Sequence, residues 1–143
     1  MSAIPMYRAQ PWHAVIVKLY NNNYTLDAYS DRLHSQGYEV INTNNYTGAL
    51  EMAREYHPAL IVAQDDPAAN IDAIRWLELQ HSDHDPVLAM TPLIIVADAA
   101  RMSVLRTEEL PDRVIVLQNR ADTLNQLTRT ITRVLRVWGL TKI

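Results

Sequence analysis

Five short apolar runs, each followed by a segment of helical periodicity, are the feature that most constrains the fold of this chain. The runs are rich in Val, Ile and Leu, and they are too short for helices buried on every side. Such runs are typical of strands in a parallel sheet that is covered on both faces. The predicted strands occupy residues 13–19, 38–41, 59–63, 92–97 and 114–117.

Helices are predicted after each strand from apolar residues that recur three or four positions apart. Gly37 is expected to end the first helix, and the pair His57-Pro58 the second, because a residue before proline avoids the helical conformation. Residues 86–91 are expected to be a simple connection. The first three helices are predicted from Leu26, Tyr29 and Leu33, from Leu50, Ala53 and Tyr56, and from Ile71, Ile74 and Leu77. The fourth helix is predicted at 99–110, and the last from apolar residues at helical spacing between Leu124 and Trp138.

This order of elements predicts a three-layer α/β domain of the flavodoxin-like (βα)5 type. Right-handed crossovers favour a five-stranded parallel sheet with the strand order 2-1-3-4-5. The domain is expected to span residues 13–138, with a lead-in at 1–12 and a tail or the start of a linker at 139–143. Ligands of such sheets lie beyond the carboxyl ends of the strands, so the functional residues are expected there.

Composition excludes several kinds of function. The 143 residues contain no cysteine, which excludes disulfides, thiolate metal sites and a cysteine nucleophile. The net charge of −3 argues against nucleic acid as a partner, and no apolar run is long enough to cross a membrane. No signal peptide is visible, so we expect a cytoplasmic protein. The turn at 19–23 has no glycine to hold a phosphate, so we expect neither an enzyme nor a cofactor, although a small nucleotide- or ligand-binding protein stays an alternative.

Three parts of the sequence stand out together: Gly37-Tyr38-Glu39-Val40, residues 49–53 together with 58–62, and Thr91-Pro92-Leu93-Ile94-Ile95. They resemble segments of the receiver domain of bacterial response regulators, of the chemotaxis type. The resemblance implies a role in two-component phosphorelay signalling. In that family an aspartate after the third strand accepts a phosphoryl group. Acidic residues after the first strand hold Mg²⁺, and a Thr or Ser and a Lys after the fourth and fifth strands bind the phosphoryl oxygens.

The positions that carry this chemistry in the family are occupied by other residues here. The acidic pair falls on Lys18 and Leu19, and no acidic residue precedes the first predicted helix. The phosphoacceptor falls on Gln64, and the Thr or Ser on Ala97. No lysine lies near the end of the fifth strand, where Arg120 is the nearest cation. We therefore expect a degenerate pseudo-receiver that binds no metal and acts through contacts with a signalling protein or its own output domain.

Asp65 and Asp66 leave a second interpretation open. A shift of one residue would put Asp65 at the acceptor position, and the chain would then be a working phosphoreceiver with an irregular acceptor at Asp65 or Asp66. The simpler interpretation is that both are solvated loop acids or helix caps. A further hypothesis is that the ammonium group of Lys18 pairs with one of them and replaces a metal ion.

Two other groups of residues are candidates for a functional role. His81, Asp83, His84 and Asp85 are potential zinc ligands, but a solvated polar loop is the simpler interpretation. Three arginines and a tryptophan of the last helix are candidates for a protein interface, and the resemblance implies a possible homodimer through the fourth helix, fifth strand and fifth helix. These interface candidates are Arg129, Arg133, Arg136 and Trp138.

Overall fold

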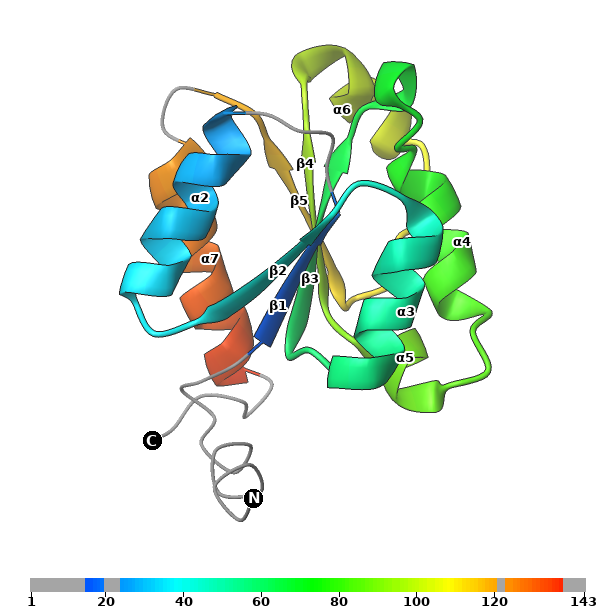
Figure 1. Cartoon of the computed structure of the whole chain (residues 1–143). Coiled ribbons are helices and arrows are strands. Elements are labelled where there is room, and N and C mark those ends of the chain that lie inside the picture. Colours follow the sequence, from blue (N-terminus) through cyan, green and yellow to red (C-terminus); the bar gives the residue numbers. More distant parts are fainter. Residues whose placement is uncertain (1–14, 20–23, 121–122, 138–143) are drawn as a thin grey trace.

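The computed structural model of the protein describes residues 15–19, 24–120 and 123–137, and it describes only the backbone of 15–18, 24–29, 123–124 and 137. In these ranges the chain forms a parallel sheet with helices on both faces (Figure 1). The predicted α/β class is therefore confirmed. None of the described helices is both long and apolar enough to span a membrane.

The strands of the described sheet run in the order β2-β1-β3-β4-β5, and each neighbouring pair is parallel. β3 is longer than its apolar run predicts, because Gln64 pairs with Val96 and Asp65 pairs with Ala97 of β4. Asp65 therefore belongs to a central strand rather than to a loop. The strands are β1 (Val15–Leu19), β2 (Glu39–Thr43), β3 (Leu60–Asp65), β4 (Leu93–Ala97) and β5 (Val114–Gln118).

The helices divide between the two faces of the sheet. Figure 1 shows α2 (Tyr24–Ser35) and α7 (Thr123–Val137) on one face, and α3 (Tyr46–Tyr56), α4 (Ala73–His81) and α5 (Pro86–Met90) on the other. Alternate residues of β3 and β4 point into the two cores. Burial of these apolar side chains is the main force that holds the helices to the sheet.

Local residue chemistry explains where the second helix begins and ends. The Asn45 side chain accepts a hydrogen bond from the Gly48 backbone N–H and so caps α3. His57 ends the helix in the left-handed conformation (φ 47°), and Gly37 (φ 93°) follows α2 in the same way. The predicted ends at Gly37 and at His57-Pro58 are thus confirmed.

Three predictions about helices were wrong. The connection at 86–91 contains helix α5, because Asp85 caps it and Pro86 occupies its first turn. The helix predicted at 99–110 is α6 (Ala99–Leu105), which ends where the Thr107 hydroxyl donates to the carbonyl oxygen of Val104. Ile71 precedes α4 and forms an isolated antiparallel bridge with Asp66.

Candidate functional site: a buried carboxylate at the end of the third strand

Asp65 is the last residue of β3 and lies at the carboxyl edge of the sheet. It is opposite Ala97 of β4, which in turn is opposite Gln118 of β5. Its side chain is 0% exposed. Side chains of a strand alternate between the two faces, so Asp65 lies on the same face as Ile61 and Ala63, toward α4 and α6.

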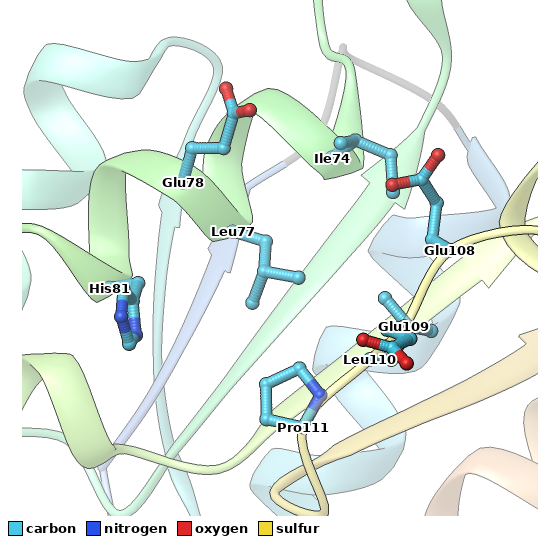
Figure 2. A pocket seen from close by; sticks show the side chains of 8 residues that line it. All are labelled: Ile74, Leu77, Glu78, His81, Glu108, Glu109, Leu110 and Pro111. Carbon is cyan, nitrogen blue, oxygen red and sulfur yellow. The ribbon is translucent and has the colours of Figure 1, made fainter.

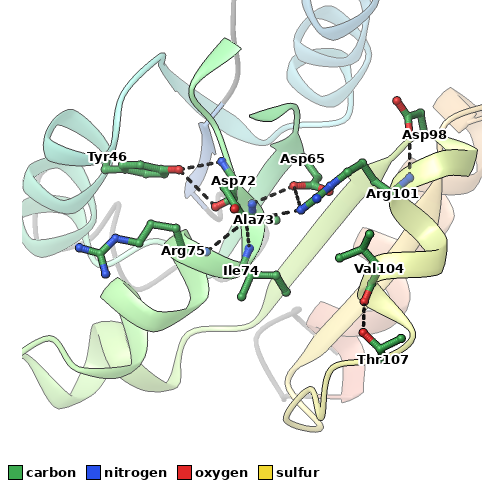
Figure 3. A network of polar contacts seen from close by, with 10 residues as sticks. All are labelled: Tyr46, Asp65, Asp72, Ala73, Ile74, Arg75, Asp98, Arg101, Val104 and Thr107. Carbon is green, nitrogen blue, oxygen red and sulfur yellow. Dashed lines mark hydrogen bonds and ion pairs between the residues drawn. The ribbon is translucent and has the colours of Figure 1, made fainter. Parts of the chain in front are cut away.

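Three hydrogen-bond donors surround the Asp65 carboxylate (Figure 3). The Nε of Arg101 donates to Oδ2 at 2.6 Å, and a terminal nitrogen of the same guanidinium donates to Oδ1 at 3.3 Å. The backbone N–H of Ala73, the first residue of α4, donates to Oδ1 at 2.9 Å. Both carboxylate oxygens are therefore engaged, which a buried charge requires if the fold is to tolerate it.

Arg101 reaches this carboxylate from the first turn of α6. The Asp98 side chain caps that helix by accepting from the Arg101 backbone N–H at 2.9 Å, and the cap fixes the direction in which the helix leaves β4. The Arg101 side chain is 22% exposed. Hydrogen bonding to Asp65 raises the pKa of Arg101 above its ordinary value, with further contributions from the charges of Asp65, Asp72 and Asp98. The guanidinium is thus a permanent cation at this edge of the sheet.

The same network extends to α4 and α3. Asp72 caps α4 by accepting from the backbone N–H groups of Ile74 and Arg75, and its Oδ1 lies 3.5 Å from Arg101. The hydroxyl of Tyr46, the first residue of α3, accepts from the Asp72 backbone N–H at 2.7 Å. Polar contacts therefore connect β3, α3, α4 and α6 around Asp65.

Asp66 has a different environment. Its backbone N–H donates to the Ile71 carbonyl oxygen at 2.7 Å, and the Ile71 N–H donates to the Asp66 carbonyl oxygen at 3.1 Å. Between them the chain makes a short 3₁₀ turn, η2 (Pro67–Ala69), and Asn70 adopts the left-handed conformation (φ 65°). The Asp66 side chain is partly exposed and does not cap that turn.

The other predicted pocket residues lie at the ends of the strands. Leu19 ends β1 with its side chain fully buried in the apolar core, and Ala97 ends β4 in the same core. Gln64 precedes Asp65 and therefore points to the opposite face of the sheet. Arg120 follows β5 and donates to the Gln118 side chain at 3.0 Å.

The interpretation of Asp65 as a solvated loop acid was wrong, because its side chain is buried in the sheet and paired with Arg101. That pairing was missed, although Asp98 three residues before Arg101 marks the start of a helix that leads away from β4. The hypothesis that Lys18 pairs with Asp65 rests on a side chain outside the described residues. Trp138 is likewise outside them.

The described residues at this edge, which do not include 20–23, do not fit a Mg²⁺ site. At the end of β1, Leu19 offers no oxygen ligand, and the oxygens of Asp65 are held by Arg101 and Ala73. Among the residues that the structure describes, no three His, Cys, Asp or Glu side chains are grouped to hold a metal ion. Of the potential ligands between 81 and 85, the two aspartates have structural roles, since Asp83 pairs with Arg54 and Asp85 caps α5.

Comparisons with known proteins agree with this fold. No protein-family model matches the chain. The polar-differentiation response regulator DivK of Brucella ovis is 31% identical over 85 residues, which cover 57% of this chain and 69% of DivK. A response regulator from Desulfuromonas acetoxidans has a TM-score of 0.66 at 20% identity, over 87% of this chain and 98% of that one.

A third similar structure is the anti-anti-sigma factor PhyR from Bartonella quintana, in a mutant form. It has a TM-score of 0.69 at 15% identity, and the match covers 97% of this chain and 55% of PhyR. At these identities the two structures support the flavodoxin-like fold, while the DivK alignment supports the family. The chain belongs to the response regulator receiver domains.

Proposed function

We propose that this receiver domain is not phosphorylated in the usual way and signals through contacts with another protein. The observation that carries the proposal is the ion pair between the buried Asp65 carboxylate and Arg101. A receiver aspartate must offer a free carboxylate oxygen to the phosphorus atom, with a divalent cation beside it to neutralise the developing charge. Here an arginine from α6 takes the oxygens, and Leu19, at a position where the resemblance implies an acidic ligand of the cation, has an apolar side chain.

In this proposal the ion pair takes the place of phosphorylation, because it already joins helices to the end of β3. Arg101 connects the end of β3 to the first turn of α6, and its second contact is with Asp72 at the start of α4. These links join the two helices to the sheet without a phosphoryl group. We therefore propose that the domain presents one constitutive surface to its partner, instead of alternating between two phosphorylation states.

The test is incubation of the whole chain with acetyl phosphate and Mg²⁺, followed by intact mass spectrometry. A receiver domain with the full set of acidic residues serves as the positive control. We expect no gain in mass beyond that of the Asp65→Asn variant treated in parallel. A gain of one phosphate that is lost in Asp65→Asn or in Asp66→Asn would contradict the proposal and would identify the chain as a phosphoreceiver with an irregular acceptor.

We also propose a homodimer through α6, β5 and α7. β5 is an edge strand of the described sheet, and Arg129, Arg133 and Arg136 are exposed on α7. Sedimentation equilibrium of the whole chain tests this part of the proposal. A dimer that dissociates in the Arg129→Glu and Arg133→Glu double variant would support it, and a monomer at all concentrations would contradict it.

A further inference from the structure

A groove separates α4 from the segment 108–111, which leads from α6 to β5 (Figure 2). It has a volume of about 670 Å³. Leu77 of α4 and Pro111 face one another across it, and the half-buried Ile74 and Leu110 add to its apolar lining. The groove is thus a concave surface with an apolar floor and polar residues around it.

The rim of the groove is acidic. Glu78 lies on the α4 side, and Glu108 and Glu109 lie on the opposite side. Glu78 is 3.5 Å from the Arg75 guanidinium, whereas neither Glu108 nor Glu109 forms an ion pair within the described residues. The remaining titratable group of the lining is His81, at the last turn of α4. The groove therefore combines an apolar floor with unneutralised negative charge.

In the part of the chain that the structure describes, neither α7 nor α5 of a second copy has both properties. The exposed face of α7 carries the complementary charges of Arg129, Arg133 and Arg136, but the apolar side chains that the structure describes on that helix are buried in its own core. The exposed apolar side chains Val87 and Met90 lie on α5 and have acidic neighbours such as Asp85. A ligand for this groove needs apolar and basic side chains together.

We propose that the groove binds a basic amphipathic helix of a partner protein. In such a helix, apolar side chains at positions i and i+4 occupy the space between Leu77 and Pro111, while flanking Lys or Arg residues contact Glu108 and Glu109. This inference rests on the proposed function only in that the domain acts through protein contacts, and it assigns that role to a face distinct from α6, β5 and α7.

The test uses a phage-displayed library of helical peptides, selected against the whole chain at low ionic strength. We expect the selected peptides to carry net positive charge with apolar residues three or four positions apart. Their affinity should fall at least about tenfold in the Leu77→Glu variant and in the Glu108→Lys and Glu109→Lys double variant. Affinity should also weaken as salt is added.

The matched control is the double variant Glu51→Lys and Glu55→Lys, which makes the same change in net charge on exposed residues of α3. It should bind the peptides with little change. The double variant at Glu108 and Glu109 alters only exposed side chains, so it keeps the test valid if Leu77→Glu fails to fold.

Four results would overturn the inference: no selected peptide, selected peptides that are acidic or neutral, binding that the groove variants leave unchanged, or self-association that Leu77→Glu abolishes. The last result would assign the groove to a second copy. Uptake of phosphate by the wild-type chain would overturn the proposed function and leave the peptide result standing, so the two failures are distinguishable.

Discussion

Replacing Arg101 by Met tests the ion pair because Met keeps an aliphatic stem of similar length and removes the charge. In this variant the buried Asp65 carboxylate would lose both donors of the guanidinium and keep the hydrogen bond from the Ala73 backbone N–H. Loss of one partner of a fully buried pair costs about 3–5 kcal/mol. Since the Arg101 side chain is 22% exposed, we expect a smaller loss of about 2–3 kcal/mol in the free energy of unfolding.

The measurement is urea unfolding followed by circular dichroism, with thermal unfolding as a second probe. A loss of this size corresponds to a fall in Tm of roughly 6–10 °C for a domain of this length. The Asp65→Asn variant should lose less, about 1 kcal/mol, because Asn can still accept from Ala73 and the freed guanidinium can turn to water. The double variant should be more stable than Arg101→Met alone, because it removes the uncompensated charge.

Two outcomes would refute this reasoning: an Arg101→Met variant within about 0.5 kcal/mol of the wild type, or a double variant whose loss equals the sum of the single losses.

Three further predictions concern neighbouring contacts. Hydrogen bonding from Arg54 lowers the pKa of Asp83, so the Asp83 carboxylate stabilises the fold above its pKa in the unfolded chain, and this stabilisation is lost as the pH falls through its pKa in the folded chain. The free energy of unfolding in urea, measured between about pH 5 and pH 2, should therefore depend less on pH in Asp83→Asn than in the wild type. An unchanged pH dependence would contradict this. Asp72→Ala removes the cap of α4 and should lower the free energy of unfolding by about 1 kcal/mol, whereas an unchanged Tm would show that the cap contributes nothing. A Cβ at Gly48 would lie 2.5 Å from the Thr43 hydroxyl, so Gly48→Ala should be more favourable in a Thr43→Ala background than in the wild type; equal effects in thermal melts of both backgrounds would disprove the clash.

The α/β class could be predicted from the sequence because the apolar runs and the helical stripes agree with each other. Alternation along β3 and β4 sends Val62 and Ile94 into one core and Ala63 and Ile95 into the other, as expected for strands buried on both faces. What failed were the boundaries that depend on polar residues. β3 continues through Gln64 and Asp65 because β4 provides backbone partners for both residues. The pattern of apolar residues in the sequence does not predict this pairing.

The candidate site was predictable only in part. The loss of the acidic residues before the first helix is visible in the sequence, and the structure places the buried Leu19 at that strand end. The pairing of Asp65 with Arg101 was not visible, because the two residues are 36 positions apart and meet only because β4, which leads into α6, pairs with β3. Likewise, Asp83 lies in the connection between α4 and α5, and its partner Arg54 is on α3, 29 positions away.

The most direct test of the central claim is a Mg²⁺ titration of the ¹⁵N-labelled chain, followed by NMR at the Arg101 Nε–H and at the backbone N–H of Ala73. Both groups donate to Asp65, so a metal ion that bound this carboxylate would displace or polarise them. We predict that both signals stay in place up to millimolar Mg²⁺. A saturable shift of both signals, absent in Asp65→Asn, would show that the carboxylate is open to a metal ion and would contradict the account.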